Sequence, residues 1–392
     1  MIKRQLAKKL KQATREYPVV ALVGPRQSGK TTLVRQVFAG YKYVSLEDLD
    51  IRTFAQTDPR GFLETYSDKV IFDEAQRVPE LFSYIQGIID ENKQQGQFIL
   101  TGSQNFLLQE NITQSLAGRV SILTLLPFSL SEIGKGGFKL DDYNKYLFKG
   151  LYPRLYDKKI SEREWYLNYI QTYIERDVRQ IKQITDLNTF QRFVKLCAGR
   201  TGQLLNLSAL ANDTGITHNT AKSWLSVLEA SFLVFLLQPH HKNFNKRLVK
   251  TPKLYFYDTG LASSLLGIER ADQVKTHPLR GSLFESLIVS EIVKSRLNQG
   301  QSPNIFFWRD KIGHEIDCLY ETAGKAISVE IKSSQTITES FFANLQYWNK
   351  LSGGQDKDSI LIYGGDEEQK RSRGRVISWK NTGQVGETSK LV

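Results

Sequence analysis

The first third of the chain alternates short apolar runs with amphipathic stretches. Residues 19–23 (Val-Val-Ala-Leu-Val) are continuously apolar, which is typical of a strand buried on both faces of a parallel sheet. Residues 32–38 have helical spacing, and apolar runs at 69–72 and 97–100 predict two further strands. The alternation of strands and helices predicts an α/β domain with a parallel sheet.

The middle of the chain has helical periodicity followed by a short strand pattern. Residues 162–184 carry an apolar face at 3.6 spacing, and residues 207–225 predict a short helix, a glycine turn and a second helix capped by Thr217. A strand-like segment at 232–237, a basic loop and Leu254 to Tyr257 follow. This order predicts a winged helix with a basic wing.

The last third returns to an α/β pattern. Residues 283–293 predict an amphipathic helix, and residues 305–309, 315–320 and 326–332 predict three strands. We therefore divide the chain into an N-terminal α/β domain (1–150), a helical and winged-helix region (151–268) and a C-terminal α/β domain (269–392).

Composition adds few constraints to this picture. The 392 residues are 40% hydrophobic and 11% aromatic, as in an ordered globular protein with two or three domains. Cys197 and Cys318 are the only cysteines and lack metal-ligand spacing. No segment approaches the ~20 apolar residues of a membrane span, and the N-terminus lacks a signal-peptide core. We expect a cytoplasmic protein with no membrane partner.

The formal net charge of +12 has two interpretations. It fits an ordinary basic surface, or an attraction to phosphate polymers such as DNA. The motifs below favour the second.

Residues 24–31 (Gly-Pro-Arg-Gln-Ser-Gly-Lys-Thr) fit the pattern G-x-x-x-x-G-K-[ST] of a phosphate-binding P-loop. Gly24 and Gly29 permit the tight turn, Lys30 can reach the β- and γ-phosphates, and Thr31 can ligate Mg²⁺. The preceding strand and following helix match the required context. We expect ATP and Mg²⁺ as cofactors. The expected nucleotide contacts come from Gly24, Pro25, Arg26, Gln27, Ser28, Gly29, Lys30, Thr31, Thr32 and Ser103.

Two acids end the strand that follows. We assign Asp73 to the metal together with Thr31, and Glu74 as the general base that polarises water. The alternative is that Asp73 and Glu74 only cap a helix that starts near Pro79.

Candidates to complete the ATPase site lie further along. Thr101 or Ser103, at the end of the next strand, could orient water, or both could be ordinary turn residues. Arg119 and Arg176 could supply transition-state charge, in the same subunit or to a neighbour. Either arginine could instead form a structural ion pair.

The helix that starts at His218 could enter a DNA major groove. His218, Asn219 and Lys222 would then face outward, and the wing would add Lys242, Lys246 and Arg247. The alternative is a protein–protein module, in which Trp224 and Leu225 are simply core.

A carboxylate–lysine group marks the C-terminal domain. Glu330 and Lys332 alternate to one face of their strand. Asp317 on a neighbouring strand could share one Mg²⁺ with Glu330, Lys332 could orient the attacking water, and Glu285 could reach in from its helix. The alternative is a Glu–Lys ion pair on a solvated sheet face.

Over nearly its full length the chain resembles a bacterial and archaeal family of AAA+-type ATPases with a C-terminal domain of unknown function that has a PD-(D/E)xK nuclease-like core. The shared motifs lie at residues 24–31, 72–76, 100–103, 116–119, 175–177, 257–261, 281–285, 308–309, 315–317 and 330–332. The resemblance implies a P-loop NTPase core, a winged-helix middle and a restriction-endonuclease-like end. AAA+-type sites commonly complete themselves across subunits, so it also implies a homo-oligomer.

One position departs from the family pattern. Lys149 to Pro153 replaces a Gly-Gly-aromatic-Pro turn, and Leu151 stands where the second glycine would be. The sequence thus predicts an ATP-hydrolysing, DNA-associated protein with a possible Mg²⁺-dependent nuclease domain. The alternative is an ATP-switched regulatory or scaffold protein that binds a protein partner.

Overall fold

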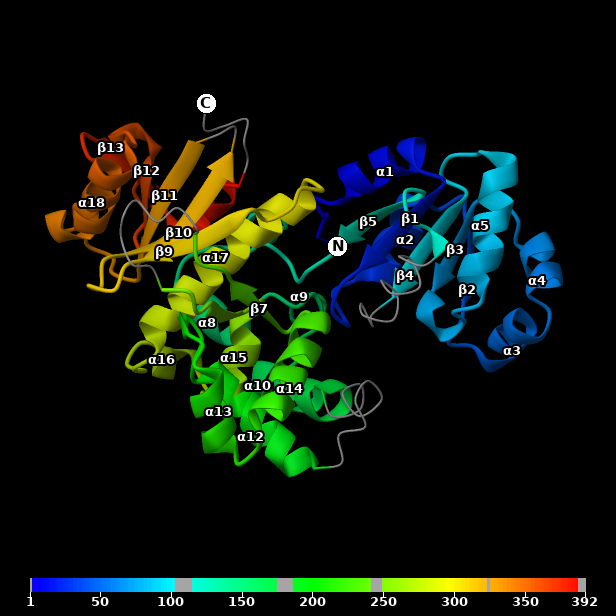
Figure 1. Ribbon diagram of the computed structural model, residues 1–392, viewed down its shortest axis with the longest axis horizontal. Helices are drawn as coiled ribbons and strands as arrows, with labels where there is room; N and C mark the ends of the chain where they lie inside the picture. The colour runs from blue at the N-terminus through cyan, green and yellow to red at the C-terminus, as the bar shows by residue number, and fades with distance from the viewer. Residues whose placement is uncertain (1, 103–114, 175–185, 241–248, 323–324, 387–392) are drawn as a thin grey trace.

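The computed structural model describes residues 2–102, 115–174, 186–240, 249–322 and 325–386. Within these residues the strands form three sheets. The five-stranded N-terminal sheet and the six-stranded C-terminal sheet lie at opposite ends of the molecule, and the helical middle region lies between and beside them (Figure 1).

The N-terminal sheet is parallel, with the order β2-β3-β4-β1-β5. Its strands are β1 (Val19–Val23), β2 (Lys42–Ser45), β3 (Val70–Asp73), β4 (Phe98–Gly102) and β5 (Val120–Thr124). Strand β4 is inserted between β1 and β3 although it follows both along the chain. The prediction of an α/β domain with a parallel sheet is confirmed.

Helices cover both faces of this sheet. Val20 and Leu22 pack with α1 (Ala7–Glu16) and α2 (Lys30–Val37), whereas Val19, Ala21 and Val23 point to the other face. That face is covered by α3 (Leu49–Thr57), α4 (Pro59–Thr65) and α5 (Leu81–Asn92). Strand β1 is buried on both sides, which is why its sequence is an unbroken apolar run.

Short helices connect the sheet to the rest of the molecule: α7 (Leu130–Lys135), α8 (Tyr143–Lys149), α9 (Arg154–Asp157), α10 (Glu162–Tyr169) and the π-helix η2 (Ile170–Ile174). Helix α8 packs on α15 (Thr259–Leu265), α16 (Ala271–Val274) and α17 (Arg280–Asn298). The domain boundary that we expected at residue 150 therefore assigns α8 to the N-terminal domain, although α8 packs on helices that follow this boundary.

The middle region contains α12 (Leu187–Ala198), α13 (Leu207–Thr214), α14 (His218–Ala230) and an antiparallel sheet in the order β6-β8-β7. The strands are β6 (Gln203–Leu204), β7 (Val234–Leu237) and β8 (Lys253–Phe256). The Thr217 hydroxyl accepts a hydrogen bond from the Thr220 N–H at 3.1 Å and caps α14. Trp224 packs edge-on against Phe190 and Phe193, so this aromatic side chain belongs to the core.

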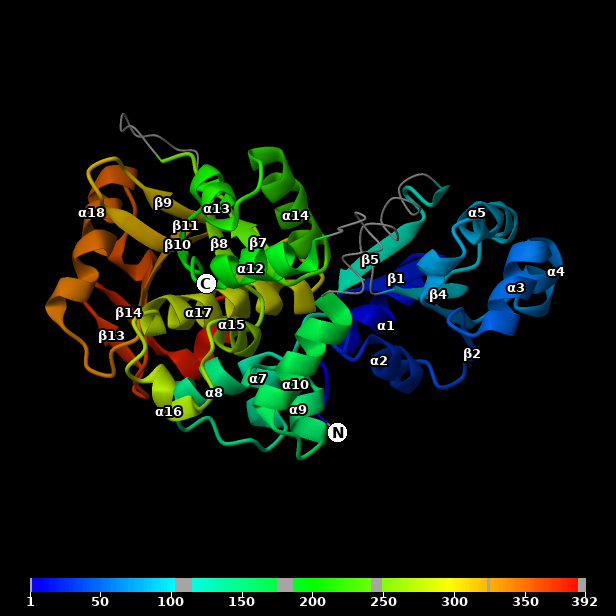
Figure 2. The ribbon, with the colours of Figure 1, turned by 90° about the horizontal axis from the view of Figure 1, so that it is seen from below.

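The C-terminal sheet has the order β13-β14-β12-β11-β10-β9. Its strands are β9 (Ile305–Arg309), β10 (Glu315–Thr322), β11 (Lys325–Lys332), β12 (Ser359–Tyr363), β13 (Gln369–Arg371) and β14 (Gly374–Ser378). Helix α17 packs on one face with Val329 and Ile331, and α18 (Ala343–Ser352) covers the other with Leu361. Figure 2 shows α17 beside the sheet and close to the middle region.

The segment after β7 pairs with β9, the edge strand of the C-terminal sheet. The Phe307 N–H donates to the Gln238 carbonyl at 3.1 Å, and the His240 N–H donates to the Phe307 carbonyl at 2.7 Å. The Val249 N–H donates to the Arg309 carbonyl at 3.1 Å. The middle region therefore covers an otherwise open sheet edge and is joined to the C-terminal domain by backbone hydrogen bonds.

None of the described helices combines the length and the apolar character needed to cross a bilayer.

Candidate nucleotide-binding site and C-terminal acid cluster

The P-loop connects the buried end of β1 to the start of α2. Gly24 has φ +148° and Gly29 has φ +91°, a region of backbone conformation that favours glycine. A Cβ on Gly24 would also collide with the carbonyl oxygen of Leu125. Both glycines of the motif are therefore required by the path of the backbone, and the loop lies at the N-terminus of a helix, where anions are favoured.

Lys30 is folded back onto its own loop. Its ammonium group donates to the carbonyl oxygens of Gly24 (3.0 Å) and Pro25 (2.9 Å). Burial lowers the pKa of Lys30 to about 8, although the nearby Glu74 and Asp73 carboxylates favour the charged form. The lysine thus lies inside the phosphate-binding loop, in a setting where an anionic ligand would stabilise its charge.

Asp73 is the centre of a hydroxyl cluster at the end of β3. Its Oδ2 accepts from the Thr31 hydroxyl at 2.9 Å and from the Tyr43 hydroxyl at 2.7 Å, and its Oδ1 accepts from Thr101. The two residues assigned to Mg²⁺, Thr31 and Asp73, are therefore in direct contact. Thr101 contacts Asp73, whereas Ser103 lies outside the described residues.

Tyr43 is a contact of Asp73 that the sequence pattern does not predict. The residue lies on β2, a strand that the hydrophobic pattern did not predict, since β2 is only partly buried. A tyrosine two positions before the polar end of a strand gives no signal of its own.

Glu74 has a left-handed backbone conformation, with φ +55°, which is uncommon for a residue other than glycine and often marks a functional position. Gln76 Nε2 donates to Glu74 Oε2 at 2.5 Å. Helix α5 begins only at Leu81 and has no side-chain cap. The alternative that Asp73 and Glu74 cap this helix is therefore wrong. Gln76 was part of the recognised motif but had been given no role.

Arg4 braces the P-loop from outside the motif. Its guanidinium donates to the carbonyl oxygens of Ser28 (2.8 Å) and Leu126 (2.6 Å) and to Glu132 Oε1 (3.2 Å). Glu132 is fully buried and forms a capping box with Ser129 at the start of α7. No local pattern of residues predicts this role, because Arg4 contacts residues 24 to 128 positions away.

A cavity of about 930 Å³ adjoins the P-loop. Its lining includes Gln27, Gly29 and Thr32 together with aromatic side chains, among them Phe138 and Tyr156. The cavity therefore combines residues of the phosphate-binding loop with aromatic side chains in one lining.

Arg119 lies at the amino ends of the parallel strands, whereas the P-loop lies at their carboxyl ends. It precedes Val120, which pairs with Val19 at the start of β1, whereas the P-loop follows Val23 at the end of β1. Its guanidinium makes two hydrogen bonds to Asp90, at 2.6 and 2.9 Å. Five strand residues span roughly 16 Å, so Arg119 cannot reach the P-loop of its own subunit. Arg176 lies outside the described residues.

The predicted DNA-contacting residues of the second helix are on the surface. His218, Asn219 and Lys222 are exposed in the first turns of α14. Lys242, Lys246 and Arg247 lie outside the described residues.

The C-terminal acids lie together, with one difference from the prediction. Glu285, Glu315 and Asp317 each place a carboxylate oxygen within 4.8 Å of the others. Glu315, two positions before Asp317 on the same strand, was missed, although this spacing directs both side chains to one face. We refer to these three residues as the acid cluster.

Glu330 and Lys332 form an ion pair at 2.6 Å beside the acid cluster. Lys332 also lies 4.0 Å from Asp317, and Asp317 accepts the Ile331 N–H at 2.7 Å. Burial and the neighbouring Asp317 raise the pKa of Glu330 to about 8. The alternative of an ion pair on a solvated sheet face is wrong in one respect, because Glu330 is only 2% exposed.

The middle region also contributes to the acid cluster. Lys253, at the start of β8, donates to Glu285 Oε1 at 2.9 Å and to Glu315 Oε1 at 2.5 Å. The Tyr255 hydroxyl donates to the same oxygen of Glu285 at 2.5 Å. Burial raises the pKa of Glu285 to about 7, while Lys253 opposes that shift. No sequence pattern predicts this role for Lys253 or Tyr255, because both lie on a strand of the middle region.

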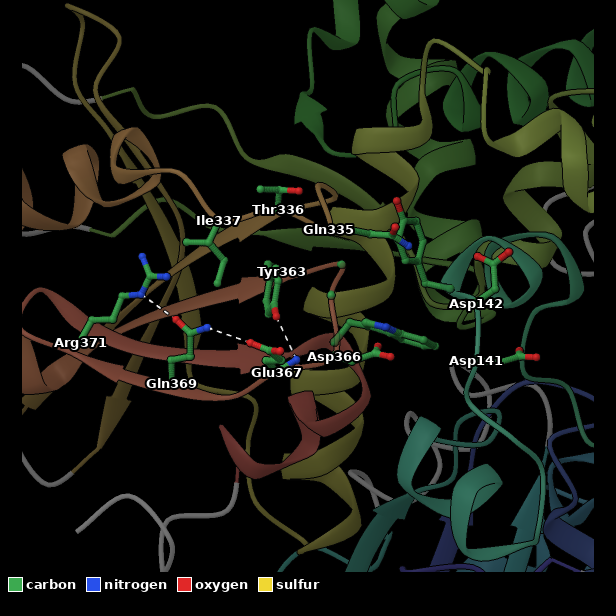
Figure 3. A pocket seen from close by; sticks show the side chains of 14 residues that line it. Asp141, Asp142, Gln335, Thr336, Ile337, Tyr363, Asp366, Glu367, Gln369 and Arg371 are labelled. Carbon is green, nitrogen blue, oxygen red and sulfur yellow. Dashed lines mark hydrogen bonds between the residues drawn. The ribbon is translucent and has the colours of Figure 1, made fainter.

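A second cavity, of about 500 Å³, lies between the start of α8 and the ends of β11 and β12 (Figure 3). Asp141, Asp142 and Glu367 give it an acidic lining. Arg371, Gln369 and Glu367 form a hydrogen-bonded row along one side. None of the residues predicted as functional lines this cavity.

Three known domain families match consecutive parts of the chain. An AAA domain matches residues 16–134, a domain of unknown function (DUF8612) matches residues 140–272, and another (DUF4143) matches residues 280–382. The second and third carry no functional description.

Similar proteins occur in bacteria and archaea. The chain is 29% identical over 338 residues to the uncharacterized protein Rv2008c of Mycobacterium tuberculosis, covering 85% of this chain and 74% of that protein. It is 21% identical over 355 residues to the uncharacterized protein MJ1544 of Methanocaldococcus jannaschii, covering 80% and 76%.

Solved structures with some likeness include the Walker-type ATPase PABY2304 of Pyrococcus abyssi, with a TM-score of 0.45, 15% identity and coverage of 68% of this chain and 96% of that one. AMPPCP-bound DnaA from Aquifex aeolicus has a TM-score of 0.30 and 14% identity, with coverage of 57% and 85%. The domain match, the parallel sheet and the P-loop geometry agree on one point: the N-terminal part of this chain is an AAA-type P-loop ATPase domain.

Proposed function

We propose that this protein hydrolyses ATP and couples the hydrolysis to remodelling or processing DNA. The observation that carries the ATPase part is the contact between Thr31 and Asp73 at 2.9 Å, with Glu74 next in sequence. A hydroxyl, a carboxylate and a second acid then lie together at the helix end where the P-loop can hold a triphosphate.

Each residue has a distinct role in this proposal. The amides of residues 24–31 and the Lys30 ammonium bind the phosphates. Thr31 and Asp73 would hold Mg²⁺, which neutralises phosphate charge when bound. Glu74 accepts the proton of the attacking water, and Thr101 keeps the Asp73 carboxylate in position through its hydrogen bond. The aromatic side chains that line the cavity next to the P-loop could pack against the base of the nucleotide.

The site is completed in our proposal by a second copy of the chain. Arg119 lies at the end of its own sheet that is remote from the P-loop, and its side chain is partly exposed. It would serve the site of a neighbouring subunit by releasing Asp90 and approaching the γ-phosphate there. This supports a homo-oligomer. Arg176 and Ser103 remain predictions from the sequence.

DNA association is the finer part of the proposal. It is supported by the net charge of +12 and by the exposed His218, Asn219 and Lys222 at the start of a helix that follows a glycine turn. Helices α12 to α14 and the antiparallel sheet have the element order of a winged helix. The alternative partner is a protein, bound by the same surface.

The deciding experiment is ATP turnover measured with and without single-stranded, double-stranded and branched DNA, at two salt concentrations. We expect DNA to stimulate turnover at low salt and less at high salt, because phosphate contacts weaken as counterions are added. The Lys30→Ala variant provides the background rate. Turnover that no DNA changes would favour the regulatory protein that binds a protein partner.

Metal-dependent cleavage of DNA by the C-terminal domain is a second candidate. It is favoured by the order α17-β9-β10-β11-α18-β12 and by the closeness of Asp317, Glu330 and Lys332. The acid cluster does not fit a divalent ion in its described state, because the Lys253 ammonium already bridges Glu285 and Glu315. We therefore derive no cleavage step.

The test compares the wild type with Asp317→Ala and Lys332→Ala on the same DNA substrates with Mg²⁺ or Mn²⁺. Nicking by the wild type that both variants lose would support a nuclease. Equal inactivity of all three would make the C-terminal domain a binding module.

A further inference from the structure

The acid cluster already contains a cation that belongs to the protein. Lys253 is only 3% exposed, and its ammonium lies between Glu285 Oε1 at 2.9 Å and Glu315 Oε1 at 2.5 Å. The lysine comes from β8 of the middle region, while the acids come from α17 and β10 of the C-terminal domain. A positive charge from one region therefore occupies the centre of a negative cluster in another.

Three of the four carboxylate oxygens of Glu285 and Glu315 already accept hydrogen bonds from protein donors. Glu285 Oε1 accepts from both Lys253 and Tyr255, and Glu315 Oε2 accepts from Arg309 at 3.0 Å. A divalent ion is held by several carboxylate oxygens at once. An ion that used the oxygens now held by Lys253 would have to displace its ammonium group.

Charge balance leads to the same result. The four acids Glu285, Glu315, Asp317 and Glu330 face the cations Lys253, Arg309 and Lys332. Three cations of the protein therefore already lie beside these four acids without any bound metal.

We infer that Lys253 is the resident cation of the acid cluster and that its ammonium group excludes divalent metal ions while tying β8 to the C-terminal domain. This inference does not depend on ATP hydrolysis. It identifies Lys253 as the residue that must move before a divalent ion can bridge Glu285 and Glu315.

The test uses the full-length protein in an Asp73→Asn background without nucleotide, so that the P-loop contributes no metal site, and Mn²⁺ alone as the probe. Binding is followed by electron paramagnetic resonance of free Mn²⁺. We expect no saturable site in this background protein. Lys253→Met removes the charge and keeps a similar length of side chain, and it should create one Mn²⁺ site that binds at least tenfold more tightly than any background binding. Adding Asp317→Asn should abolish that site.

Two controls separate the ammonium from general effects. Lys250→Met removes an exposed lysine three residues earlier and should create no site. Lys253→Arg keeps the charge and should also bind no Mn²⁺. A Lys253→Met variant that folds but gains no site would overturn the inference.

The protein with Lys253 intact provides a measurement that does not depend on the folding of the methionine variant. With Lys253 present, adding Asp317→Asn should leave the Mn²⁺ titration unchanged. A stoichiometric Mn²⁺ site that Asp317→Asn removes would show that metal binds beside Lys253, and the inference would be wrong.

Discussion

The Thr31 hydroxyl donates a hydrogen bond to Asp73 Oδ2 at 2.9 Å, although the two residues are 42 positions apart. Thr31 is the last residue of the P-loop and lies in the first turn of α2, and Asp73 ends β3. Because β1 and β3 are parallel in one sheet, both residues lie at the carboxyl ends of its strands. The contact brings the motif for phosphate binding and the motif for hydrolysis into one site.

Replacing Glu74 with Gln should separate nucleotide binding from hydrolysis. The amide keeps the shape of the side chain but cannot take a proton, so turnover should fall by roughly 10²- to 10⁴-fold while ATP still binds. Steady-state ATP hydrolysis and calorimetric titration with ATP measure the two effects. Glu80→Gln, an exposed glutamate at the start of α5, is the matched control. Undiminished turnover in Glu74→Gln would remove Glu74 from the role of general base.

ATP affinity should depend on pH through Lys30. Burial lowers the pKa of Lys30 from 10.5 to about 8, so the unliganded loop loses its ammonium charge as the pH rises through 8. Only the charged form attracts phosphate, and affinity should therefore fall by up to about tenfold per pH unit above that point. Titrations between pH 7 and 9.5 measure this fall. Lys30→Met should bind ATP more weakly and without this slope; an equal slope in the variant would assign the titration to another group.

Arg4 should support both the stability of the protein and the shape of the P-loop. Arg4→Met leaves the buried Glu132 carboxylate without its cation, which costs about 3–5 kcal/mol when a buried pair is broken. Urea unfolding should register this loss, and ATP affinity should fall because the Ser28 carbonyl loses its donor. Arg15→Met, on the exposed face of α1, should change neither. Combining Arg4→Met with Glu132→Gln should recover part of the stability but not the affinity.

Arg119 should act on a neighbouring subunit. Arg119→Ala should lower ATP turnover by about 10³-fold or more, as expected for an arginine that stabilises phosphoryl transfer, with little change in ATP affinity. Mixing Arg119→Ala with Glu74→Gln should restore part of the activity, since some interfaces would then carry both intact residues. Arg163→Ala, which removes another exposed arginine paired with an acid, is the control. Full turnover by Arg119→Ala would make its pair with Asp90 merely structural.

Lys222 should contribute to DNA affinity. Lys222→Glu should weaken binding and reduce the slope of log affinity against log salt by about 1, as expected when a phosphate contact is lost. Fluorescence anisotropy with a labelled duplex at several salt concentrations measures both. Lys350→Glu changes an exposed lysine on α18 by the same charge and should have a smaller effect. Equal losses in the two variants would indicate only a general charge effect.

Features that depend only on residues close together in the sequence could be predicted from it. The apolar run of β1, the glycines of the P-loop and the acids at the end of β3 are local patterns, and each directly reflects burial, backbone conformation or strand length. The helix that begins after Thr217 was predictable for the same reason, because a cap and an apolar face are encoded within one turn or two.

Features that depend on the order of strands could not be predicted in this way. Thr101 contacts Asp73 because β4 is inserted next to β3, and no local pattern of residues encodes that insertion. Tyr43 reaches the same carboxylate from a strand too polar to be recognised.

The sequence by itself determined that this chain has a P-loop followed by two acids, an α/β start and end, and a helical middle with a helix capped by Thr217. Only the tertiary structure decided that Arg4 braces the P-loop, that Arg119 faces away from it, and that Lys253 lies among the C-terminal acids. The physical reason is the range of the interactions. Periodicity, turns and caps act over a few residues, whereas buried ion pairs join side chains that only packing brings together.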